Sequence, residues 1–91
     1  MDNPEIDKYG NKYWWQHGSI HRDDGPAIEF ADGDKVWYQH GKCHRDDGPA
    51  IMLVNKKYDW YLHGNHLSLD EWLDKVEMPD EDKVMMKLKY G

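Results

Sequence analysis

The chain has 91 residues, of which 38% are hydrophobic and 33% are charged, and its formal net charge is -6. A chain of this size forms one domain or a short repeat array, and no run of about 18 apolar residues is present to cross a membrane. The acidic start, MDNPEID, lacks the basic and apolar regions of a secretory signal, and the single cysteine, Cys43, cannot form an internal disulfide. We therefore expect one domain in the cytoplasm, without membrane contact.

The charge of the chain excludes one class of partner, and its aromatic content indicates what forms the core. Eighteen acidic residues against twelve basic ones repel a polyanion, so duplex nucleic acid is not an expected partner. Five Trp, six Tyr and one Phe occur in an otherwise hydrophilic chain. We expect these rings to supply most of the hydrophobic core.

A 23-residue repeat organises the chain. Three similar aromatic runs recur at this offset: YWWQHG from Tyr13, VWYQHG from Val36 and DWYLHG from Asp59. The run HRDDGPAI begins at His21 and again at His44, and residues 13–31 match residues 36–54 at twelve of nineteen positions. After the third aromatic run the pattern is lost, while residues 3–12 form a degenerate half-unit. The sequence therefore predicts a repeat array followed by a different C-terminal segment.

Each unit is predicted to consist of β-hairpins. Residues 27–31 and 35–40 are short strand-like runs, and Asp32-Gly33 between them is a strong hairpin signal. Second turns are predicted at His17-Gly18 and His40-Gly41, because His tolerates positive φ. Proline fixes φ and lacks an amide donor, so the corners between units are expected at the Pro-containing breakers. These are Asp24-Gly25-Pro26 and Asp47-Gly48-Pro49.

The C-terminal segment carries helix signals instead. Ser68 and Glu71 form a capping box, and the apolar residues around them recur at helical spacing, which predicts a helix over 69–77. Pro79 ends that helix, and the order of acids and then lysines in residues 80–90 predicts a short second helix. We expect this tail to cap the last strand, because an open sheet edge pairs with other chains.

The expected fold is mainly β with C-terminal α, an antiparallel β-hairpin meander of 23-residue units capped by one or two short helices. Residues 1–91 form a single domain, in which 3–67 are the repeat array and 68–91 are the helical cap. The units start near residues 13, 36 and 59. A two-faced aromatic sheet of this size is hard to stabilise alone, so we expect a homodimer, through the open sheet face or by edge pairing at the N-terminal half-unit.

The repeat pattern resembles two groups of repeat proteins. Its period and its order of aromatic, Gly and Asp-Gly resemble MORN-type β-hairpin repeats. A closer likeness, over about residues 9–67, is to the W-x-x-x-G-x-x-H-R-x-D-G-P-A repeat proteins of tailed phages and some large DNA viruses. The matching residues are Trp14, Gly18, His21, Arg22, Asp24, Gly25, Pro26 and Ala27, then Trp37, Gly41, His44, Arg45, Asp47, Gly48, Pro49 and Ala50. The resemblance implies a small phage-encoded accessory protein, expressed in the cytoplasm of a bacterial host, that acts on host machinery or host defence.

Two motifs invite a catalytic or metal-binding interpretation. HRD begins the catalytic loop of protein kinases, but the Leu and Asn of that loop are replaced here by Asp24 and Ile28, and no phosphate loop is present. The six histidines have H-x3-H and H-x2-H spacings, but Gly18 and Gly41 disfavour the helix that would place two imidazoles on one zinc ion. We interpret these residues as turn formers and expect no catalytic residue, no metal and no cofactor.

Aromatic side chains are expected on both faces of the sheet. One Trp of each unit should stack in register with its neighbours on one face, and the next ring along each strand should line the other face. Two helices cover only one face, so the second is either buried by curling or dimerisation, or is a binding surface. Arg22 and Arg45 beside exposed rings would bind a small anion with a stackable base. The candidate binding residues are Trp14, Trp15, Arg22, Trp37, Tyr38, Arg45, Trp60 and Tyr61.

The preferred functional hypothesis is a non-enzymatic protein that binds and inhibits a host protein through its aromatic and acidic surface. Tyr and Trp are enriched in interface hot spots, and the negative charge steers the chain toward basic surfaces, such as those of nucleic-acid-binding or defence proteins. The alternative is a module that sequesters a small nucleotide-like anion. An enzyme ranks third, because the sequence contains no nucleophile and base pairing, phosphate loop or metal quartet.

Overall fold

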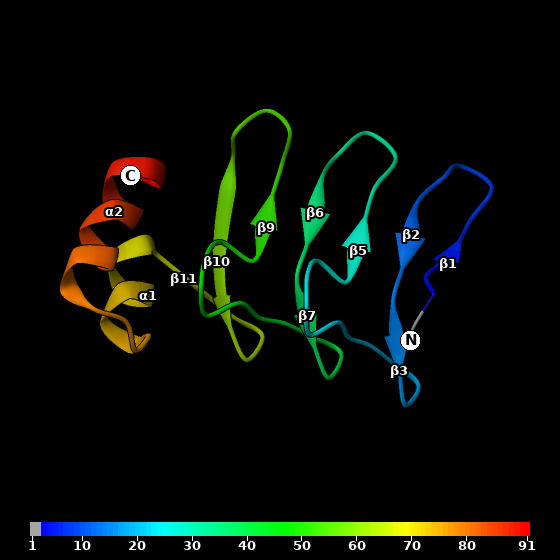
Figure 1. Ribbon diagram of the computed structural model, residues 1–91, viewed down its shortest axis with the longest axis horizontal. Helices are drawn as coiled ribbons and strands as arrows, with labels where there is room; N and C mark the ends of the chain where they lie inside the picture. The colour runs from blue at the N-terminus through cyan, green and yellow to red at the C-terminus, as the bar shows by residue number, and fades with distance from the viewer. Residues whose placement is uncertain (1–2) are drawn as a thin grey trace.

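The computed structural model describes residues 3–91, in which three hairpin units lie side by side and two helices stand at one end (Figure 1). The strands are β1 (Glu5–Ile6), β2 (Lys12–Tyr13), β3 (Trp15–Gln16), β4 (Ser19–Ile20), β5 (Ile28–Glu29), β6 (Lys35–Val36), β7 (Tyr38–Gln39), β8 (Lys42–Cys43), β9 (Ile51–Met52), β10 (Tyr58–Leu62) and β11 (Asn65–Leu67). The helices are α1 (Leu69–Lys75) and α2 (Asp80–Tyr90).

The main sheet has seven strands in the order β1-β2-β5-β6-β9-β10-β11, and every neighbouring pair is antiparallel. Two further hairpins, β3-β4 and β7-β8, form small sheets of their own. The predicted fold class, a mainly β antiparallel meander with C-terminal helices, is confirmed. No helix lies between residues 27 and 54.

The long strand of each unit changes partner at its tryptophan. In the first unit the Trp14 amide donates to the Ala27 carbonyl at 2.9 Å, and the Trp14 carbonyl accepts from the His21 amide at 3.0 Å. The residues before Trp14 therefore pair within the main sheet, and those after it pair within the small hairpin. The second unit repeats both bonds around Trp37.

The turns follow the residue types that the sequence provides. His17 and Gly18 have φ of 51° and 79°, and positive φ at both central residues is the requirement of a type I′ hairpin. The same pair of positive angles recurs at 40–41 and 63–64. At the opposite ends of the hairpins, the equivalent loop position is Gly10, Gly33 and then Lys56, which holds φ of 66° without the freedom of glycine.

The corners between units are more deeply buried than the turns. Ala27 and Ala50 have no exposed surface, and Pro49 is also fully buried. A Cβ atom on Gly48 would lie 2.6 Å from the guanidinium carbon of Arg45, so a side chain at this position would displace the arginine. At the second corner, compact residues such as Gly48 and Ala50 are therefore needed because the chain approaches itself closely.

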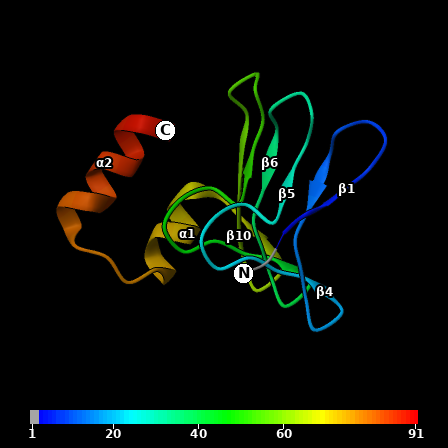
Figure 2. The same cartoon turned by 45° about the vertical axis from the view of Figure 1, so that its right-hand side comes forward.

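A buried apolar cluster lies at the cap. Trp60, Trp72, Leu73 and Val76 are buried together, between the last hairpin and the helices. The predicted capping box is present, since Ser68 Oγ accepts from the Glu71 amide and the Glu71 carboxylate accepts from the Ser68 amide. Figure 2 shows α1 between the strands and α2, which has no fully buried residue. Within residues 3–91, no helix is long and apolar enough to cross a membrane.

Candidate functional site

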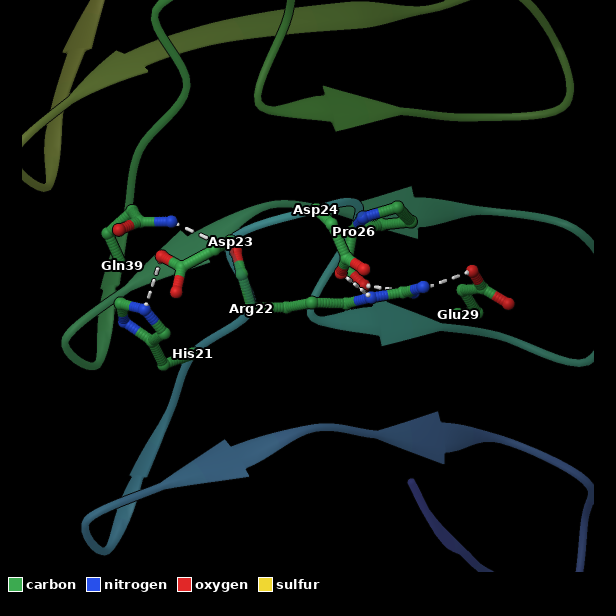
Figure 3. Close-up of polar contacts among 7 residues, drawn as sticks. All are labelled: His21, Arg22, Asp23, Asp24, Pro26, Glu29 and Gln39. Carbon is green, nitrogen blue, oxygen red and sulfur yellow. Dashed lines mark hydrogen bonds and ion pairs between the residues drawn. The ribbon is translucent and has the colours of Figure 1, made fainter. Parts of the chain in front are cut away.

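The most elaborate polar structure surrounds Arg22 at the first corner (Figure 3). The Arg22 guanidinium lies over the Trp14 ring, 4.0 Å from its centroid. Its Nε donates to Asp24 at 2.9 Å, and its Nη1 donates to the Pro26 carbonyl at 3.1 Å and to the Glu29 carboxylate at 3.3 Å. The planar Arg22 cation thus connects Trp14, the corner loop at Pro26 and Glu29 of β5.

The second corner repeats this arrangement around Arg45. Its guanidinium lies 3.9 Å from the Trp37 centroid, and its Nε donates to Asp47 at 2.8 Å. Nη1 donates to the Pro49 carbonyl at 3.0 Å and approaches the Met52 sulfur at 3.5 Å. Met52 replaces the Glu29 of the first unit, so Arg45 lies in the less charged of the two environments. The interpretation of HRDDGPA as a structural corner is supported by both sets of contacts.

The expected in-register stacking of tryptophans is wrong, and the sheet topology gives the reason. Equivalent strands of successive units are two strands apart in the main sheet, which is about 10 Å at ordinary strand spacing. Direct stacking needs ring centroids within about 7 Å. The Trp14 and Trp37 rings instead contact the arginines of their own units, Arg22 and Arg45. In the last unit Trp60 packs against Trp72 of α1, with 4.6 Å between ring centroids.

Histidines connect neighbouring units. His21 Nδ1 accepts a hydrogen bond from the His40 amide at 2.8 Å, and His44 Nδ1 accepts one from the His63 amide at 2.9 Å. Each pair of rings lies 4.5 Å apart. The contact thus links histidines of different units, 19 residues apart, rather than the two of one H-x3-H motif. An imidazole that accepts at Nδ1 must be neutral, because both nitrogens of the protonated ring are donors.

This geometry predicts that stability falls in mild acid. Burial first, and then His63, lower the pKa of His44, while Asp46 opposes the shift. Stability from this group is complete above the ordinary histidine pKa of about 6.5 and is lost as the pH falls below it, because the unfolded chain binds the proton more readily. His44→Asn keeps an acceptor for the His63 amide without a titrating ring. Urea unfolding between about pH 8 and about pH 5 should therefore show a steeper loss for the parent chain than for His44→Asn. Parallel pH profiles would contradict the assignment.

Exposed carboxylates gather along the corners, and we call Asp23, Asp24, Asp46 and Asp47 the acidic ridge. The four residues line one hollow of about 540 Å³, together with both corner arginines. The side chains of Asp23, Asp24 and Asp47 are 74%, 85% and 78% exposed. A hydrogen bond from His21 lowers the pKa of Asp23, so its charge persists in mild acid. The ridge is negative at neutral pH and is open to a partner.

The candidate binding residues identified in the sequence do not form one site. Trp14 and Trp60 are buried at 8% and 5% exposure, and Trp37, Tyr38 and Tyr61 are half-buried, whereas Trp15 is 46% exposed. The side chains of Arg22 and Arg45 are 23% and 19% exposed and are already engaged. The structure brings Arg22, Trp37 and Arg45 to the hollow of the acidic ridge.

Several residues that hold or line the two corners were not identified from the sequence. The Gln39 amide donates to the Arg22 carbonyl at 2.9 Å, and Trp72 Nε1 donates to the Arg45 carbonyl at the same distance. Asp23 and Asp46 occupy the unspecified position of the H-R-x-D pattern, which gave no reason to single them out. Their repetition beside Asp24 and Asp47 was the available signal of an acidic surface.

The remaining reactive groups are the potential metal ligands and the thiol of Cys43. Within residues 3–91, no group of three or more His, Cys, Asp or Glu side chains lies close enough to hold a metal ion. Burial raises the pKa of the Cys43 thiol to about 11, so this group is protonated at neutral pH. The chain matches no protein-family model, no curated protein and no solved structure in the three comparisons made.

Proposed function

We propose that the protein is a non-catalytic binding module that occupies a basic surface of a host protein and thereby inhibits it. The observation that carries this proposal is the acidic ridge, where four carboxylates of two corners surround one hollow. Negative potential of this kind accelerates association with basic surfaces and fixes the orientation of the encounter. The targets that fit are host proteins with a basic nucleic-acid-binding groove, including defence proteins that have one. The phage origin implied by the repeat pattern is part of this proposal.

The polar contacts of the corner favour this function over sequestration of a small anion. Arg22 and Arg45 would be the cations for such a ligand, but their Nε and Nη1 atoms already bind carboxylates and carbonyls. The carboxylates of the acidic ridge would also repel a phosphate entering the hollow. Trp14 is buried beneath Arg22, which leaves its ring unavailable for stacking on a base.

The test compares two variants of equal net charge. Asp23→Asn with Asp46→Asn removes two ridge charges and keeps Asp24 and Asp47, which bind the arginines. The control, Asp74→Asn with Glu81→Gln, removes two exposed carboxylates of the helices. Each protein is used as bait in an extract of the bacterial host, and bound proteins are identified and quantified by mass spectrometry.

A specific host protein should be retained by the parent chain and by the control, and its recovery should fall about fivefold or more with the ridge variant at low salt. Equal recovery with all three baits would overturn the proposal. Native mass spectrometry of the freshly isolated protein decides the alternative, because a retained nucleotide-sized ligand would favour sequestration.

The homodimer expected from the sequence stays a prediction. Strand β1 lies at one edge of the main sheet, and its residues Glu5 and Ile6 are both exposed. Edge pairing of two chains would take place there, because an uncovered edge strand offers unpaired backbone groups.

A further inference from the structure

A second hollow, of about 880 Å³, lies between the second corner, the third unit and the helical cap. We call it the cap groove. Met78, Met85 and Met86 contribute to its apolar lining, and carboxylates of Asp47, Glu77 and Asp82 also face it. The cap groove therefore combines flexible apolar side chains with negative charge.

The apolar lining is only partly used by the chain's own core. Met78 and Met86 pack against the buried cluster, but Met85 is 62% exposed. Methionine is unbranched and polarisable, so a surface built from it adapts to apolar side chains of different shapes. An exposed methionine beside two half-buried ones provides a place where a further apolar side chain gains contacts.

The charges that line the cap groove indicate which class of partner fits it. Four carboxylates line the cap groove, those of Asp46 and the three named above, against the single ammonium of Lys75. An anionic lipid surface would be repelled by this groove and by the overall charge of -6. A peptide segment that carries lysines or arginines beside a large apolar residue matches both the rim and the floor.

We propose that the cap groove binds a basic amphipathic segment of the partner protein, with an apolar side chain anchored on the methionines. This inference rests on the proposed function, since it names the part of the partner that is recognised. Asp46 and Asp47 of the acidic ridge also line the cap groove, so a single basic partner can engage the two surfaces together.

The direct test uses the protein labelled with 13C at its methionine methyl groups and three synthetic peptides. The first has leucine and lysine in an amphipathic helical pattern, the second replaces lysine with glutamate, and the third replaces leucine with serine. Met52 is an internal reference, because it lies beside Arg45 and outside the cap groove. The leucine-lysine peptide should shift the methyl signals of Met78, Met85 and Met86 and leave that of Met52 unchanged.

The control peptides and variants separate the two features of the groove. Neither control peptide should shift the signals at the same concentration. Met85→Gln should weaken binding of the leucine-lysine peptide about five- to tenfold, and Glu77→Gln about two- to fivefold at low salt. Leu88→Gln is the matched control, because Leu88 is a 75% exposed residue of α2 outside the groove, and it should leave affinity unchanged.

Each other outcome overturns the inference. Equal shifts with the glutamate peptide, or equal losses with Leu88→Gln and Met85→Gln, would show nonspecific apolar contact. Methionine shifts that depend on protein concentration without peptide would assign the groove to a second copy of the chain. If the host protein recovered in the pull-down is lost with the ridge variant but retained with Met85→Gln, the groove inference fails while the proposed function stands. If neither variant affects recovery, the proposed function fails as well.

Discussion

Replacing Trp72 with alanine should lower the free energy of unfolding by about 3–5 kcal/mol, the usual cost of deleting a fully buried tryptophan. Trp72 has no exposed surface, and its ring packs against Trp60. It also donates from Nε1 to the Arg45 carbonyl. In the preceding unit this donor is supplied by Gln39, whereas the equivalent residue of the third unit is Leu62. Trp72 therefore supplies to the second unit the donor that the third unit lacks at Leu62.

A conservative variant separates the two contributions of Trp72. Trp72→Phe retains most of the ring contacts but removes the donor, which leaves the Arg45 carbonyl unpaired at a cost of about 1–3 kcal/mol. Trp15→Phe is the control, because Trp15 is 46% exposed and should cost much less. Urea unfolding followed by far-UV circular dichroism measures all three variants. A loss of stability with Trp72→Phe no larger than with Trp15→Phe would show that the hydrogen bond from the indole to the Arg45 carbonyl does not stabilise the end of the array.

Local signals in the sequence were sufficient for the turns and the helices. The pairs His17-Gly18 and His40-Gly41 adopt the positive φ angles that were expected of them. Helix α2 spans the predicted residues 80–90, and α1 ends at Lys75, two residues before the predicted end. Val76 is extended and serves as the C-cap, so the chain leaves the helix before the proline. These features depend on neighbouring residues and on backbone sterics, which a single sequence contains.

The contacts between units could not be predicted in the same way. A strand pattern does not state how far apart equivalent strands lie, so the tryptophans were expected to stack although a hairpin separates them. The acceptor role of His21 toward the His40 amide depends on the register of two hairpins. Lys56 likewise occupies the loop position of Gly33 with positive φ, because the surrounding hairpin dictates the conformation.

The sequence singled out some of the residues at the candidate site, namely Arg22, Trp37 and Arg45, but not their geometry. Arg22 and Trp14 were expected to lie together, and they do, but as a closed cation-π contact rather than an open anion site. The acidic ridge arises because Arg22 and Arg45 each bind one Asp of their own corner. The two bound residues, Asp24 and Asp47, nevertheless remain largely exposed to solvent. Such a division of roles depends on side-chain directions at the corner, which composition does not reveal.

Arg45→Ala should destabilise the fold by about 1–3 kcal/mol, because it removes hydrogen bonds to the Pro49 carbonyl and to Asp47 and uncovers the Trp37 ring. Arg45→Lys should recover only part of this loss, since an ammonium cannot supply the planar set of donors. Lys57→Ala is the matched control: it removes the same charge from an exposed side chain and should change stability by less than about 0.5 kcal/mol.

Measuring binding alongside stability decides what the corner does. If the corner is structural, the folded fraction of Arg45→Ala should bind the proposed host protein with nearly the affinity of the parent, because the proposed contact surface is the acidic ridge and the arginine is engaged by the chain's own corner. A small-anion site predicts the reverse, with a nearly normal melting temperature and lost ligand, since a solvated phosphate-binding arginine contributes to affinity and hardly to folding. An unchanged melting temperature in both Arg22→Ala and Arg45→Ala would therefore contradict the structural role, whatever the binding data show.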